Sequence, residues 1–333
     1  MTLTSWLRHS GMMLLMLMSG MAHAASDSIE NPAGMREAQL SEMSQDHSLP
    51  LNQRVAATIM LGNYSGANAL IAVGRASRSQ HIELRIASIN AAQRWQGRAK
   101  WDVVSPLLDD TEPRVQSRAV RALAPLWSKL PDSYRRALAP AIDRQIAASA
   151  DTSEGRLEKA WLYRMRQQYE ESEQLLLSEW QSFEQPRVAV ALAELYRDTN
   201  REALALDVLE QGVVAHSGSA LLHHSLALSY WRTQQTRQSI DHMRQAYKIE
   251  PQNAHYAYLL GLMLLEAEPK QALTLFETAY VQQGTPQYLY SLCEAKLAVG
   301  ETAKTCLSQL SKFYPETAII SLTNKYSNIQ NIN

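Results

Sequence analysis

Small and apolar residues in the second half of the chain recur at the spacing of one helix face, and the pattern repeats after 34 residues. Each copy has two apolar stripes separated by a short polar stretch, which predicts two antiparallel helices. Small residues in the middle of both stripes let the helices approach closely, and larger apolar residues fill the seam between them. The two clearest copies are Leu192, Ala193, Tyr196, Ala205, Leu209 and Leu226, Ala227, Tyr230, Ser239, Met243.

This spacing resembles the tetratricopeptide repeat, a helix pair that needs stacked neighbours to bury its apolar face. The resemblance covers residues 151–315 as about five repeats, of which the first and last depart most from the pattern. It implies an all-α fold, a right-handed α-α superhelix of stacked pairs. Residues 316–333 follow as a C-terminal capping helix and a polar tail.

The first half, residues 50–150, carries a shorter helical repeat. Arg54, Arg85 and Arg118 each stand in a short stretch of small and apolar residues, and each stretch is followed by a second amphipathic segment. The third unit resembles the HEAT-like repeat, through Asp110, Pro113, Val115, Arg118, Ala119, Ala122 and Leu123. We therefore expect HEAT-like helix pairs before the tetratricopeptide-like ones.

Residues 1–24 have the composition of a secretory signal peptide. The apolar run 11–21 is too short to span a bilayer, and an A-x-A cleavage motif ends at Ala24. We expect export to the periplasm and no membrane span in the mature chain, with an N-terminal membrane anchor as the alternative. The polar segment 25–49 is expected to be a linker, within which 36–44 could form a short helix.

Composition and motifs argue against several functional classes. The formal net charge of −1 gives no general electrostatic attraction to nucleic acid. The sequence holds no C-x-x-C-H, H-E-x-x-H or G-x-S-x-G motif, so we expect no haem, no metal, no cofactor and no enzyme. His223 and His224 are adjacent and point different ways on a helix, which favours an ordinary polar lining over a metal site.

Cys293 and Cys306 are the only two cysteines. They fall at the close-approach positions of the two helices in the last repeat, once a shift of one residue is allowed in the second helix. In an oxidising compartment this placement predicts a disulfide, and the alternative is a pair of small buried thiols.

The tetratricopeptide resemblance implies a concave face built by the first helix of each repeat. An aromatic and apolar strip flanked by arginines is expected there, and such residues dominate binding hot spots. The alternative is that the strip packs against a neighbouring helix, such as the C-terminal one. The expected partner-binding residues are Arg197, His224, Trp231, Arg232, Tyr258, Leu262 and Tyr290.

These features predict a non-catalytic periplasmic scaffold or adaptor that binds a protein or peptide partner in its groove. Two alternatives remain open. HEAT-like repeats followed by tetratricopeptide-like ones are similar to the C-terminal half of exported multihaem cytochromes, so the chain could be an accessory or assembly factor for a c-type cytochrome. It could also be an enzyme whose site forms only in three dimensions.

Overall fold

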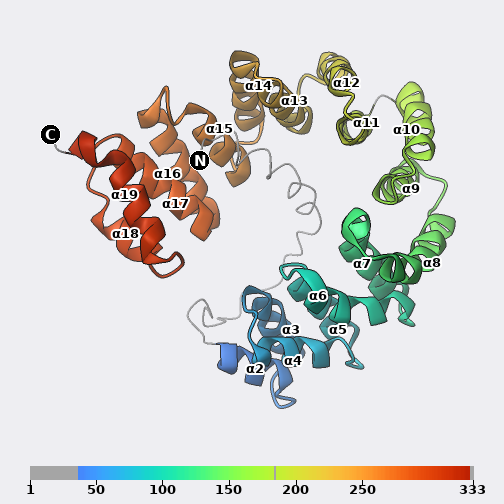
Figure 1. Cartoon of the computed structure of the whole chain (residues 1–333). Helices are drawn as coiled ribbons and strands as arrows, with labels where there is room; N and C mark the ends of the chain where they lie inside the picture. Colours follow the sequence, from blue (N-terminus) through green and yellow to red (C-terminus); the bar gives the residue numbers. More distant parts are fainter. Residues whose placement is uncertain (1–36, 184, 331–333) are drawn as a thin grey trace. The chain divides into compact units, whose positions relative to one another are not determined.

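A computed structural model describes residues 37–183 and 185–330 of the 333-residue chain. All regular secondary structure in these two ranges is helical (Figure 1). The predicted all-α helical-repeat fold class is therefore confirmed. The chain divides into two compact units, residues 1–175 and 176–333, and the boundary falls within helix α10. The predicted signal peptide, residues 1–24, lies outside the described residues.

The first unit contains short helices paired along the chain, because a proline, glycine or polar turn follows each apolar stripe. Its elements are α2 (Glu37–Gln45), α3 (Leu51–Met60), η1 (Leu61–Asn63), α4 (Ala67–Ala76), α5 (Ile82–Ala92), α6 (Gly97–Val104), η2 (Ser105–Asp109), α7 (Pro113–Leu123), η3 (Ala124–Lys129), α8 (Asp132–Ala148), α9 (Ser153–Met165) and the start of α10 (Tyr169–Phe183).

The packed core begins earlier than the sequence pattern predicts. Helix α2 lies in the range 25–49 that was assigned to a linker, yet its Leu40 is fully buried in the core of the first unit. The hydroxyl groups of Ser44 and Thr58 also lie 2.7 Å apart and are buried. The short helix expected within this range therefore forms as α2, and it belongs to the packed core rather than to a linker, because its apolar face covers α3 and α4.

The three aligned arginines of the first unit have different environments. Arg85 forms an ion pair with Asp110 of the following turn, with Nε 2.7 Å from Oδ2, and both side chains are nearly buried. Arg54 is buried, and its Nε donates to the carbonyl oxygen of Ser44 at 3.4 Å. Arg118 is exposed. Among these three, only Arg85 therefore links one helix pair to the next through a buried charge pair.

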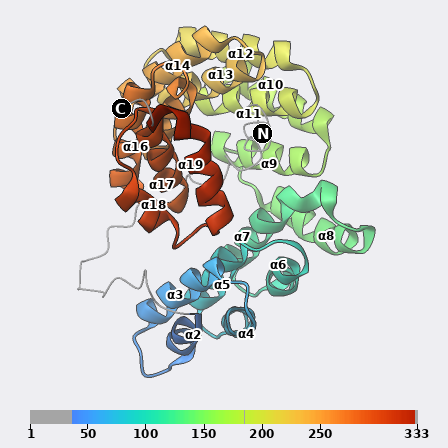
Figure 2. The ribbon, with the colours of Figure 1, turned by 60° about the vertical axis from the view of Figure 1, so that its left-hand side comes forward.

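The second unit continues the helix pairs at the predicted places. Its elements are the end of α10, α11 (Pro186–Asp198), α12 (Glu202–Ala215), α13 (Ala220–Arg232), α14 (Thr236–Ile249), α15 (Ala254–Leu264), α16 (Pro269–Gln283), α17 (Pro286–Ala298), α18 (Lys304–Leu310) and α19 (Glu316–Gln330). Helix α19 lies beside α17 in both views (Figures 1 and 2).

Contacts between paired helices explain the small residues of the repeat. The Ser239 hydroxyl on α14 donates to the carbonyl oxygen of Ala227 on α13 at 2.8 Å, which is possible only where the two backbones approach closely. In the next pair, a Cβ atom at Gly261 would lie 2.7 Å from Cε1 of Phe276. Glycine is therefore required there by the facing ring.

No helix in the described part of the chain is both long enough and apolar enough to cross a bilayer.

Candidate partner-binding face

The predicted strip lies on the first helices of successive pairs in the second unit: α11, α13, α15 and α17. Five of its seven residues remain accessible to solvent to some degree. Trp231, Leu262 and Tyr290 are half-buried and pack with one side on the apolar core of this unit. The side chains of Arg197 and Arg232 are 27% and 32% exposed. These five residues form the candidate face.

His224 and Tyr258 do not belong to this surface, which corrects the prediction for both. Tyr258 is 4% exposed, its ring stacks on Tyr288 at 4.6 Å, and its hydroxyl accepts from Nε2 of Gln287 at 2.9 Å. His224 is 6% exposed and lies against the ring of Tyr256 at 5.1 Å. A partner cannot contact either side chain while these contacts hold.

The buried imidazole of His224 lies beside the half-buried imidazole of His255. The rings of His224 and His255 lie 5.7 Å apart, and the buried Nε2 atom of each has no hydrogen-bond partner among residues 37–183 and 185–330. Burial, with a smaller contribution from His255, lowers the pKa of His224 to about 3. Burial also lowers the pKa of His255. Both imidazoles are therefore neutral at pH 7 and destabilise the fold when they are protonated.

The neighbouring histidine has a different role. Nε2 of His223 lies 3.0 Å from the carbonyl oxygen of Ser217, so this nitrogen carries the proton. Nδ1 of His223 then accepts from Nδ1 of His242 at 2.9 Å. Each imidazole thus has a defined tautomer without a metal ion. Within residues 37–183 and 185–330 there is no group of three His, Cys, Asp or Glu side chains with metal-site geometry.

Carboxylates of the same unit hold the two arginines of the face. Nε and Nη2 of Arg232 lie 3.2 and 3.0 Å from Oε1 of Glu202, which also accepts from the hydroxyl of Ser229 at 2.6 Å. Nη2 of Arg197 lies 3.3 Å from Oδ1 of Asp198. These pairs limit the rotamers of the guanidinium groups but leave part of each accessible.

The C-terminal helix covers the far end of the strip. The ring of Tyr290 contacts that of Tyr314 at 5.4 Å. Glu294, one helical turn further along α17, accepts from Nζ of Lys325 at 2.7 Å and from the hydroxyl of Tyr326 at 3.2 Å. The alternative of internal packing therefore holds at α17, whereas α11, α13 and α15 keep their accessible residues.

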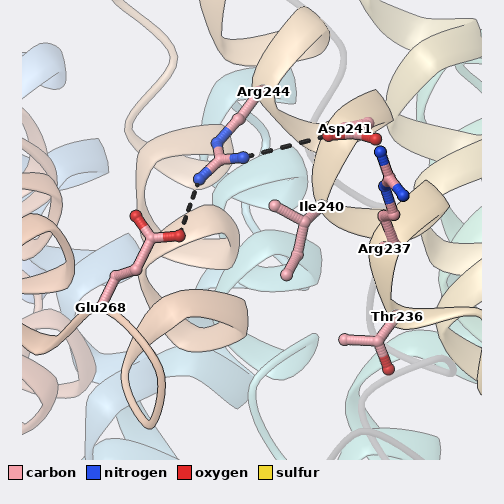
Figure 3. A pocket seen from close by; sticks show the side chains of 6 residues that line it. All are labelled: Thr236, Arg237, Ile240, Asp241, Arg244 and Glu268. Carbon is pink, nitrogen blue, oxygen red and sulfur yellow. Dashed lines mark hydrogen bonds and ion pairs between the residues drawn. The ribbon is translucent and has the colours of Figure 1, made fainter.

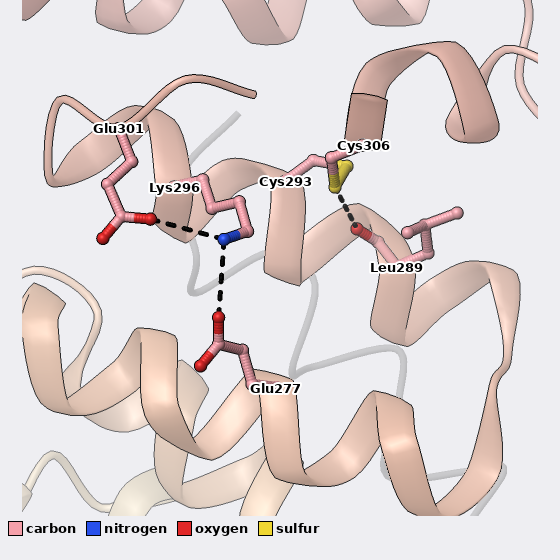
Figure 4. The surroundings of a disulfide bond; sticks show 6 residues. All are labelled: Glu277, Leu289, Cys293, Lys296, Glu301 and Cys306. Carbon is pink, nitrogen blue, oxygen red and sulfur yellow. Dashed lines mark hydrogen bonds and ion pairs between the residues drawn. A yellow bond between two sulfur atoms is a disulfide. The ribbon is translucent and has the colours of Figure 1, made fainter. Parts of the chain in front are cut away.

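The cysteine pair lies behind this end of the face. Cys293 on α17 and Cys306 on α18 are joined as a disulfide with their Cα atoms 5.6 Å apart, and Sγ of Cys306 lies 3.9 Å from the carbonyl oxygen of Leu289 (Figure 4). The predicted pairing is thus geometrically sound. It joins the last, shortest helix pair at the close-approach positions occupied elsewhere by alanine, glycine or serine.

A shallow, open depression of about 540 Å³ lies on α14, a second helix of its pair, and the sequence pattern did not indicate it. Arg244 lies at its rim, with Nη2 3.0 Å from Oε1 of Glu268 and Nη1 3.9 Å from Oδ1 of Asp241 (Figure 3). Arg237 and Ile240 complete the lining with Thr236. Its two carboxylates, Asp241 and Glu268, are both paired with Arg244, and no histidine is among its lining residues.

Comparison with known proteins identifies a fold resemblance only. No protein-family profile and no curated protein sequence matches the chain. Among solved structures, MamA is 16% identical with a TM-score of 0.40, and the match covers 50% of this chain and 95% of that one. YrrB, described as a TPR protein with an unusual peptide-binding site, is 14% identical with a TM-score of 0.43 and covers 56% and 98%. A thermophilic TPR protein of Thermus thermophilus is 17% identical with a TM-score of 0.37 and covers 53% and 98%. Scores and identities this low carry no inference about function.

Proposed function

We propose that the protein is a non-catalytic scaffold that holds a segment of a protein partner on the first helices of its second unit. The observation that carries this proposal is the half-buried pair Trp231 and Leu262 on α13 and α15, flanked by Arg197 and Arg232. A partly exposed tryptophan beside arginines, supported by a rigid helix stack, is the composition of a binding hot spot.

The proposed contact is short. Helix α19 covers Glu294, so the partner segment extends over α11, α13 and α15 and ends near Tyr290. An extended segment over three adjacent first helices spans roughly 20–30 Å, or about 6–9 residues, at about 10 Å per helix and 3.3 Å per residue.

The proposed location is the periplasm, supported by the signal-like residues 1–24 and by a cysteine pair placed to form a disulfide. A c-type cytochrome is one partner of the proposed kind. Haem staining of the recovered protein separates it from other partners.

The test uses site-specific photocrosslinking in cells that export the full chain. A photoreactive amino acid replaces Leu262, and a matched control places it at Val281, which is 85% exposed on α16. We expect a discrete partner band from position 262 alone, and Trp231→Ala should lower its yield by at least about tenfold. Equal bands from both positions, or a band indifferent to Trp231→Ala, would contradict the proposal.

A further inference from the structure

The net charge of the chain is the sum of two regions whose net charges have opposite signs. Residues 50–150 contain 14 Lys and Arg against 7 Asp and Glu, a net charge of +7. Residues 151–333 contain 16 against 21, a net charge of −5. The overall value of −1 therefore does not describe residues 50–150, a part of the first unit with a clear excess of positive charge.

Helix α7 carries three of these fourteen basic residues and no acidic one. Arg114, Arg118 and Arg121 on α7 are spaced by four and three residues, so they share one face of the helix. All three are exposed, while Val115 and Ala119 on the opposite face are fully buried. The arginines rise along the helix axis in steps of roughly 6 and 4.5 Å, which makes a continuous row of guanidinium groups. We call this row the α7 arginine row.

The described part of the chain neutralises only one end of the row. Arg121 pairs with Glu158 of α9, and its guanidinium lies 5.9 Å from the ring centre of Trp161. The described residues offer no ion-pair partner to Arg114 or Arg118. Two carboxylates stand in the turn before α7: Asp110 is paired with Arg85, and Glu112 forms no ion pair with either arginine in the described part of the chain.

The contacts of Asp110 explain why it leaves the row uncompensated. Its Oδ2 lies 2.7 Å from Nε of Arg85, and its Oδ1 accepts from the backbone N–H of Glu112 at 2.9 Å. Both oxygens are therefore committed to the packing of one helix pair on the next. Two guanidinium groups without an ion pair in the described residues, those of Arg114 and Arg118, therefore remain on the helix, and guanidinium forks match carboxylates in a bidentate manner.

From this arrangement we infer that the α7 arginine row binds an acidic polypeptide segment of a partner. The surroundings favour a peptide over other anions. Helix α7 and the elements that contact it (α5, α6, η2, η3 and α8) expose no large apolar side chain that could enter a membrane, and the exposed Leu70 and Ile71 lie on α4. Trp101 is buried and stacks on Tyr134 at 4.2 Å, and the half-buried ring of Trp161 lies 5.9 Å from the guanidinium of Arg121, so these rings are already engaged and are poorly placed to stack on nucleic-acid bases.

The test measures fluorescence anisotropy of a labelled peptide of about 12 residues, rich in Asp and Glu, with the full chain at low salt. The variant Arg114→Glu with Arg118→Glu changes only exposed side chains. The control Arg78→Glu with Arg98→Glu changes the net charge equally, at exposed positions of the same unit. We expect binding to weaken by about tenfold in the first variant and by less than about twofold in the control.

Three outcomes would overturn the inference: no peptide binding by the unaltered chain, equal loss in both double variants, or preferential binding of anionic vesicles or a short oligo-dT added as competitors. The row lies in the first unit, so Trp231→Ala should leave peptide binding unchanged. The two proposals can therefore fail independently: Trp231→Ala tests the proposed function, and Arg114→Glu with Arg118→Glu tests the acidic-peptide site.

Discussion

The imidazoles of His224 and His255 in the second unit lead to a quantitative prediction about stability in acid. His224 has a pKa of about 3 in the folded chain against an ordinary value of 6.5, because it is buried. The folded pKa is lowered, so the unfolded state binds the proton more readily. The stabilisation is complete above pH 6.5 and is lost progressively as the pH falls toward 3.

At pH 5 the difference is already large. An unfolded histidine with a pKa near 6.5 is mostly protonated there, while His224 in the folded chain is not, which favours the unfolded state by about 2 kcal/mol. Burial lowers the pKa of His255 in the same direction, so its contribution adds to the loss. Nε2 of each imidazole has no hydrogen-bond partner in the described residues, so no acceptor there stabilises a proton on that nitrogen.

The assay is hydrogen–deuterium exchange of peptides from α13 and α15 between pH 7 and pH 5, corrected for intrinsic rates, which reports the opening free energy of these helices directly. In the variant His224→Leu, the loss of opening free energy on acidification should be smaller by about 2 kcal/mol than in the unaltered chain. The control is His81→Leu, an exposed histidine that should leave this pH dependence unchanged. An identical pH slope with and without His224 would refute the reasoning.

Three further predictions concern stability, each measured by urea unfolding. Replacing Cys293 by alanine should cost about 3 kcal/mol in the chain-entropy account, given a separation of 13 residues, and an unchanged midpoint under oxidising conditions would contradict the disulfide. Gly261→Ala should lower the free energy of unfolding by about 1–3 kcal/mol, because the new Cβ meets a facing aromatic ring. Gly218 has open space around it, so Gly218→Ala should not lower this free energy, and equal effects of the two substitutions would contradict the contact at Gly261. Arg85→Ala should lower the free energy of unfolding by about 3 kcal/mol, because it leaves a buried carboxylate unpaired. The control Arg98→Ala removes an exposed ion pair and should cost less than about 1 kcal/mol. A reversed order would show that the buried pair does not stabilise the helix stack.

The helix pairs were predictable because their determinants are local and periodic. The small residue at the close-approach position is required by the facing helix of the same pair, as the bond from Ser239 to the Ala227 carbonyl shows. The cysteine pair follows from the same rule, since Cys293 and Cys306 occupy these positions in the last pair. Sequence spacing alone therefore specifies which residues meet within a pair.

The accessible surface was less predictable, because it depends on neighbouring pairs. Tyr258 holds a repeat position expected on the concave face, yet Tyr288 of the next pair stacks on it and Gln287 binds its hydroxyl. The burial of His224 likewise depends on Tyr256 and His255. No periodic pattern encodes the identity of these neighbours. The helix α2 was missed as a core element for a similar reason, since Leu40 is buried by helices that follow it along the chain.

The extent of the candidate face depends on how tightly α19 packs on the rest of the second unit. The contacts indicate that a partner could not readily displace this helix. The ion pair between Lys325 and Glu294 has side chains 57% and 14% exposed, so it contributes no more than about 1 kcal/mol. Leu322, however, is 2% exposed within the core cluster of the unit, and its burial alone contributes about 2 kcal/mol. Ile319 and Tyr326 pack against the same cluster. A partner would have to replace this apolar contact in full to reach Glu294, which is why the proposed contact ends near Tyr290 and depends on Trp231 and Leu262.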